Sequence, residues 1–130
     1  MAKESYKNYL KNSEVSSANQ MRFAIILFRA KEYAEALVNI EEAKKSDKTN
    51  NIYLNRLYAY ACYEASNLKN DQEGFKKGLA ALETLISKIA ADKITESDYE
   101  YTGKLQSKIP GNDSLALINL NKALSMNSAQ

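Results

Sequence analysis

The stretch from Gln20 to Ala43, QMRFAIILFRAKEYAEALVNIEEA, constrains the fold of this chain more than any other. Its apolar residues recur every three or four positions, which predicts an α-helix on each side of Lys31-Glu32. A connection of two polar residues makes two such helices antiparallel neighbours. Ala24 and Ala36 favour close packing, because only small side chains let helix axes approach to the lower end of the usual range of about 8 to 10 Å.

Small residues at fixed places, with an aromatic residue at the turn, are the pattern of a tetratricopeptide repeat (TPR), which this stretch resembles. The residues that carry the resemblance are Phe23, Ala24, Tyr33, Ala36, Ile40 and Ala43. The tryptophan and the closing proline of the family are replaced here by Gln20 and Lys48.

The same pattern recurs along the chain at close to the TPR period, which is about 34 residues. Tyr58-Ala59 stand 35 residues after Phe23-Ala24. Near the end of the chain the spacing of the second helix returns at Ala116, Leu120 and Ala123. The recurrence extends the resemblance over nearly the whole sequence, and DYEYTGKL followed by this last helix looks like bacterial arrays of the kind.

The resemblance implies an all-α fold, an α-solenoid of antiparallel helix hairpins wound into a right-handed superhelix. We expect one domain over residues 1–130, with a lone second helix at 1–14 followed by repeats at 15–50, 51–94 and 95–130. The polar sequence NLKNDQE at 67–73 predicts an inserted surface loop. Thr95 and Asp98 predict a capping box at the start of a helix. Because the first helix of the leading repeat is absent, we expect the chain to be an internal piece of a longer protein.

Composition limits the classes of function. With 130 residues, of which 45% are hydrophobic and 26% charged, a single soluble domain with a core is expected. The net charge of +2 comes from 18 basic and 16 acidic residues that are interspersed, which is too balanced to indicate nucleic acid or an anionic membrane surface. The longest apolar run, Phe23 to Phe28, is far shorter than the roughly 20 residues of a membrane span. The opening MAKESYKNYLK is not a signal peptide, so the sequence leaves the compartment open.

The residues that usually perform catalysis are scarce. Histidine, the commonest general base and zinc ligand, does not occur in the sequence, and there is one cysteine. Cys62 is interpreted as a small buried hydrophobic residue. Asp98 and Glu100 lie two apart on a helix and point to different sides, which makes a poor carboxylate pair. We therefore expect no enzymatic activity, no cofactor and no metal site.

Repeats of this kind stack into a curved array with an extended concave surface. By resemblance, this groove is lined by the first helix of each hairpin and binds a segment of a protein or peptide partner. Tyr and Arg are enriched where interfaces concentrate their binding energy. The lining residues that the resemblance implies are Met21, Ile25, Phe28, Arg29, Arg56, Tyr60, Tyr63, Glu64, Glu100, Lys104, Ser107 and Lys108.

Three alternatives stay open at this point. Met21, Ile25, Phe28, Tyr60 and Tyr63 could pack inside the array instead of contacting a ligand. The module could also be a structural spacer that self-associates through its terminal helices, since the last helix is apolar on more than one side and a terminal repeat normally needs a polar outer face. Finally, it could be the helical part of a larger ligand-binding or enzymatic protein.

Overall fold

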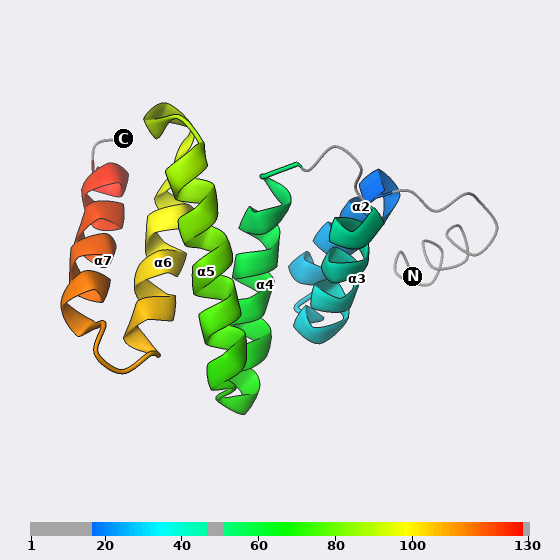
Figure 1. Ribbon diagram of the computed structural model, residues 1–130, viewed down its shortest axis with the longest axis horizontal. Helices are drawn as coiled ribbons and strands as arrows, with labels where there is room; N and C mark the ends of the chain where they lie inside the picture. The colour runs from blue at the N-terminus through cyan, green and yellow to red at the C-terminus, as the bar shows by residue number, and fades with distance from the viewer. Residues whose placement is uncertain (1–16, 47–50, 129–130) are drawn as a thin grey trace.

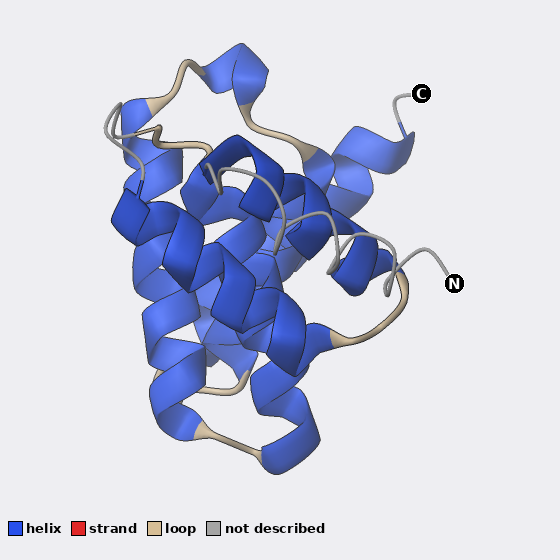
Figure 2. Cartoon of the chain, turned by 90° about the vertical axis from the view of Figure 1, so that its right-hand side faces the viewer, coloured by secondary structure: helices blue, strands red, loops and turns tan. Residues whose placement is uncertain are grey.

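A row of α-helices, placed side by side in chain order, makes up the molecule (Figure 1). The computed structural model describes residues 17–46 and 51–128, and no strand occurs in this part of the chain (Figure 2). The all-α fold class predicted from sequence is confirmed. The helices are α2 (Ser17–Arg29), α3 (Tyr33–Ser46), α4 (Leu54–Lys69), α5 (Gln72–Lys88), α6 (Glu96–Ser107) and α7 (Asp113–Ser128), with a short 3-10 helix, η1 (Ala91–Lys93), before α6.

Pairs of successive helices pack most extensively, α2 with α3, α4 with α5 and α6 with α7. Contacts of α3 with α4 and of α5 with α6 join these hairpins, and α4 also touches α6 directly. Within the described ranges no helix has both the length and the apolar character needed to cross a membrane. The lone helix expected at 1–14 lies outside the described residues.

Each hairpin turn contains one residue in the left-handed backbone region: Lys31, Asn70 and Gly111, with φ of 63°, 54° and 90°. Such a residue reverses the chain within very few positions. The surface loop predicted at 67–73 is therefore wrong: α4 continues to Lys69 and α5 begins at Gln72. The polar side chains of this segment belong to exposed helix ends, and only Asn70 and Asp71 form the turn.

Two hairpins cross where a glycine meets the neighbouring backbone. A Cβ atom on Gly78 would lie 3.3 Å from the carbonyl oxygen of Ala59, and a Cβ atom on Gly103 would lie 3.0 Å from that of Ala116. In the first hairpin Ala24 and Ala36 are completely buried. Small residues thus stand at the places where the sequence pattern expects close approach of the helices.

The largest group of buried apolar side chains lies between α4, α5 and α6. It includes Phe75, Leu82, Leu85 and Leu105. Smaller clusters lie between α2 and α3, around Leu27, and between these helices and α4, around Ile40 and Ala61. Because the first of these clusters is the largest, most of the buried apolar side chains lie in the α4 to α6 section.

Candidate functional site

The α4 and α6 helices are joined by a buried carboxylate, Asp98. The capping box predicted at Thr95 is present, since Thr95 Oγ1 accepts a hydrogen bond from Asp98 N at 3.1 Å and Asp98 Oδ2 accepts one from Thr95 N at 3.0 Å. The same carboxylate also binds α4: Arg56 Nε and Nη2 donate to its two oxygens at 2.9 and 2.7 Å, and the Tyr60 hydroxyl donates at 2.6 Å. Asp98 therefore caps the start of α6 and anchors this helix to α4.

The charges of this network support each other. Burial of Asp98 opposes its ionisation, but the hydrogen bonds from Arg56 and Tyr60 outweigh burial, so the pKa of Asp98 lies below its ordinary value. The hydrogen bond to Asp98 raises the pKa of Arg56. Burial, followed by the bond to Asp98, raises the pKa of Tyr60. At neutral pH the site holds a bidentate ion pair and a neutral phenol, an arrangement suited to structure.

Next to this network, three tyrosines pack against one another. The ring of Tyr60 stacks on that of Tyr101, with centroids 4.1 Å apart and planes at 15°. Tyr63 meets Tyr101 edge to face at 5.7 Å. Burial, followed by the charge of Glu64, raises the pKa of Tyr101, and Tyr33 in the first hairpin adds to the effect. Tyr33 in turn contacts Phe28 edge to face at 5.2 Å.

Charged groups of both signs border these rings. The Tyr101 hydroxyl donates to Glu64 at 3.0 Å. Lys104 Nζ lies 5.2 Å from the centroid of Tyr101, within reach of a cation–π interaction, and 3.2 Å from a carboxylate oxygen of Glu100. Tyr63, Glu64, Tyr101 and Lys104 are all partly exposed. We call these four residues the α4/α6 surface.

The structure places the predicted groove residues in several different settings. Arg56 and Tyr60 hold α4 to α6, whereas Tyr63, Glu64, Glu100 and Lys104 gather at the partly exposed surface beside them. Met21 and Phe28 pack against the core cluster that contains Ile40, while Ile25 and Arg29 are exposed on α2. Lys108 follows the end of α6, where its carbonyl oxygen accepts a hydrogen bond from Gln72 Nε2 at 2.9 Å. Ser107 is exposed nearby.

Sequence reasoning missed two residues of the site, Asp98 and Tyr101. Asp98 was recognised only as a helix cap, because the distance to Arg56, 42 positions earlier in the chain, depends on how α6 packs on α4. Tyr101 follows Tyr99 in the sequence DYEY, where two tyrosines alternate with an aspartate and a glutamate. This alternation does not indicate which face of the helix is buried, so it could not single out Tyr101.

In the part of the chain that the structure describes, no group of three or more His, Cys, Asp or Glu side chains could hold a metal ion. Cys62 is buried, and burial raises the pKa of its thiol to about 11, so the thiolate nucleophile is not formed at neutral pH.

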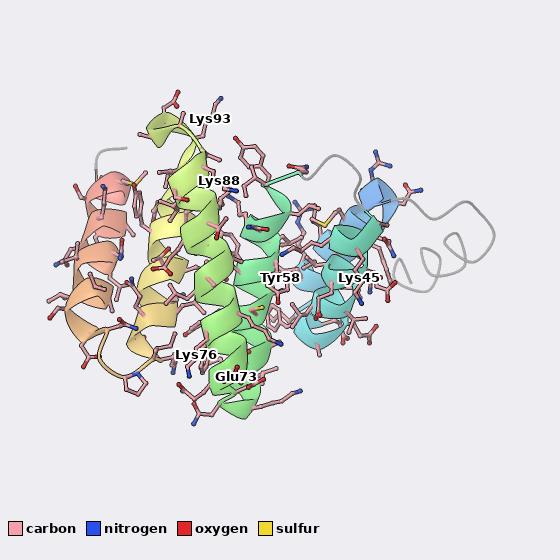
Figure 3. All side chains as sticks on the ribbon, viewed as in Figure 1. Lys45, Tyr58, Glu73, Lys76, Lys88 and Lys93 are labelled. Atoms are coloured by element: carbon pink, nitrogen blue, oxygen red, sulfur yellow. The ribbon has the colours of Figure 1, made fainter. Side chains whose placement is uncertain are left out.

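A hollow of about 420 Å³ lies away from the α4/α6 surface, where α3, α4 and α5 meet. Two of its polar side chains donate to backbone carbonyls: Asn55 Nδ2 donates to that of Ala81, and Thr84 donates to that of Ala80. Lys44 Nζ lies 4.2 Å from the ring centroid of Tyr58, which points toward α3 (Figure 3). We therefore favour the α4/α6 surface as the candidate site.

Comparison with protein-family models, with curated proteins and with solved structures found no match to this chain.

Proposed function

We propose that this chain is a non-catalytic protein–protein interaction module that binds a segment of a partner protein across the α4/α6 surface. The observation that carries the proposal is the cluster of Tyr63 and Tyr101 bordered by Glu64 and Lys104. These side chains are partly exposed and are already held by ring contacts and hydrogen bonds. Tyrosine offers contact area together with a polar group, which favours it in binding interfaces.

The repeat architecture that supports this proposal is TPR-like. Three hairpins follow one another, small residues stand at the crossings of each, and every turn contains a single left-handed residue. In an array of this kind α2, α4 and α6 are the first helices of their hairpins and line the concave side. The α4/α6 surface then lies in the groove, with Phe28 at its apolar end.

The contacts separate the residues that position the surface from those that we expect to bind the partner. Arg56 and Tyr60 have their polar groups in bonds to Asp98, so we assign them to positioning the surface. The ring of Tyr60 lies under Tyr101 and holds it in place. Tyr63 and Tyr101 then offer apolar contact area, while Glu64 and Lys104 orient charged or polar groups of the partner. Side chains that are already ordered lose little conformational entropy on binding.

The test is affinity capture from the lysate of the source cells, followed by titration of the retained protein. Lys104→Glu should reduce affinity at least about fivefold, corresponding to roughly 1 kcal/mol, because it reverses the charge beside the tyrosines. Since Lys104 is near the surface, its ion pair contributes about 1 kcal/mol or less to stability, and the variant should stay folded. Lys104→Arg should retain binding.

Lys76→Glu is the matched control, because Lys76 also pairs with a carboxylate on its own helix, Glu73 at 3.9 Å, and lies on α5 (Figure 3). A partner that binds both charge reversals as well as the wild type would contradict the proposed surface. Recovery of only the bait protein from wild type and variants alike would instead favour the structural spacer.

A further inference from the structure

Helix α7 has large apolar side chains that the described residues leave exposed. Leu117, Ile118 and Leu124 are 61%, 61% and 63% exposed. On one side of this helix, next to α6, there is a hollow of about 310 Å³. Its lining consists of Glu96, Glu100, Leu120, Ala123 and Leu124, which we call the α6/α7 groove.

In the preceding hairpin, α4/α5, the groove at the corresponding place is covered by another helix of this chain. The two hairpins can be aligned on the points where their helices approach each other most closely. These points are Gly78 with Ala59 in the α4/α5 hairpin and Gly103 with Ala116 in the α6/α7 hairpin. Counting from these points, the groove residues correspond in order to Ile52, Arg56, Leu82, Leu85 and Ile86. Of these, Leu82 and Leu85 belong to the core cluster with Leu105 of α6, and Ile52 and Ile86 pack against that cluster. Arg56 binds Asp98 of α6. A helix therefore fills the earlier groove.

The charge at the groove is reversed between the two hairpins. In the earlier groove Arg56 pairs with the acidic Asp98 at the start of the covering helix, whereas the α6/α7 groove has Glu100 at the place of Arg56. At the place of the apolar Ile52 it has Glu96. Glu96 and Glu100 are four residues apart and so lie on one face of α6. The existing pair between Glu100 and Lys104 joins two side chains that are 42% and 38% exposed, and such surface pairs are weak. The rim is therefore complementary to a basic side chain.

We propose that the α6/α7 groove binds an amphipathic α-helix of another protein, one with an apolar stripe and Lys or Arg along the edge that faces Glu96 and Glu100. The apolar stripe covers Leu120, Ala123 and Leu124, as α6 covers Leu82, Leu85 and Ile86. The basic residue occupies the place that Asp98 takes in the earlier contact. This groove lies beside the α4/α6 surface, to which the pair of Glu100 and Lys104 connects it, and its occupant is defined by opposite charge.

Two labelled synthetic peptides test this directly by fluorescence anisotropy. Each is about 18 residues long, enough for helix formation in water to be measurable, and has one leucine stripe. In the first, lysines border the stripe, and in the second glutamates replace every lysine. The lysine peptide should bind at least about tenfold more tightly than the glutamate peptide. A Glu96→Lys, Glu100→Lys double variant should reverse this preference.

Leu124→Glu should weaken binding of the lysine peptide, with unchanged helicity, because Leu124 is exposed before binding. Ile118→Glu is the matched control, since Ile118 is similarly exposed on α7 but does not line the groove. Equal affinity for the two peptides, or equal loss in the Leu124 and Ile118 variants, would overturn the proposal. So would a dimer in solution that Leu124→Glu dissociates, because the occupant would then be a second copy. Lys104→Glu separates the two sites, as it should weaken partner binding at the α4/α6 surface but leave binding of the lysine peptide intact.

Discussion

At the scale of single residues, Asp98 determines how α4 and α6 meet. Its side chain is completely inaccessible to solvent, whereas that of its partner Arg56 is 25% exposed. A buried carboxylate is tolerated only when hydrogen bonds replace its hydration. Here four donors do so, two on Arg56, one on Tyr60 and one on the Thr95 backbone.

Replacing Asp98 by Asn should lower the free energy of unfolding by about 2 to 3 kcal/mol, because Arg56 loses its counter-charge inside a packed contact. The side-chain amide nitrogen of the new asparagine would also face one of the groups that now donate hydrogen bonds to Asp98. Urea denaturation followed by circular dichroism measures the change. Asp92→Asn serves as the control, since Asp92 is exposed, and it should change stability by less than about 0.5 kcal/mol. Equal effects of the two variants would contradict the role of Asp98.

The pH dependence of the Asp98 contribution has a definite sign. The pKa of Asp98 is lower in the folded protein than its ordinary value, so its ionised form stabilises the fold above the unfolded pKa, which is about 3.9. This stabilisation is lost as the pH falls through the folded pKa. The difference in stability between wild type and Asp98→Asn should stay constant from about pH 7 to pH 5 and shrink below about pH 4. A difference that is unchanged at about pH 3 would contradict the ion pair.

Residue-level prediction from sequence was limited for a physical reason. Arg56 and Tyr60 were expected to contact a partner, because Arg and Tyr are common in interfaces. Their hydrogen bonds to Asp98 instead depend on the packing of α4 against α6, which helical periodicity does not encode. The alternative that Tyr60 packs within the array agrees with its stacking on Tyr101. For Tyr63 and Lys104, contact with a partner stays a prediction.

At the scale of helices, small residues set the distance between the two members of a hairpin. A methyl group on Gly103 would lie 2.6 Å from Leu120 Cγ and 3.0 Å from the carbonyl oxygen of Ala116. The leucine side chain can shift, but the backbone carbonyl cannot move without moving α7. The crossing of α6 and α7 therefore depends on the absence of a side chain at this position.

Gly103→Ala should destabilise the fold by about 1 to 3 kcal/mol through overpacking. This cost outweighs the gain of about 1 kcal/mol in helix propensity that alanine brings. Thermal unfolding measures the outcome, with Ser107→Ala, an exposed position on the same helix, as the control. A higher melting temperature for Gly103→Ala would show that the two helices are not held at this distance.

Helices themselves were the most predictable elements. The three- and four-residue spacing around Leu27 and Ile40 indicated α2 and α3, and both residues are completely buried. The segment 67–73 was misread because its polar side chains resemble a loop in composition. A left-handed Asn70 reverses the chain in so few residues that polar helix ends on both sides look like one continuous polar stretch.

At the scale of the whole molecule, stability is expected to be uneven along the row. The core cluster between α4, α5 and α6 contains the greatest number of buried apolar side chains, whereas α7 leaves much of its apolar surface exposed. In helical arrays each unit is stabilised mainly by its neighbours. The ends of the described row should therefore open more readily than its middle.

Hydrogen exchange measured by mass spectrometry should show the slowest amides in α4 and α5 and faster exchange in α7. The lysine-bordered peptide should slow exchange in α7 and in the first turns of α6, since it covers both. Uniform protection along the chain would instead indicate that the row unfolds as one cooperative unit.

The bond between Arg56 and Asp98 also has a mechanical consequence. It joins two helices that do not follow each other in the chain, and its geometry is directional. The corresponding places at the first junction hold Met21 and Leu54, and contacts between apolar side chains permit sliding. Under a bending force we expect the first hairpin to pivot against the second before the second and third separate, which would make the second joint the stiffer one.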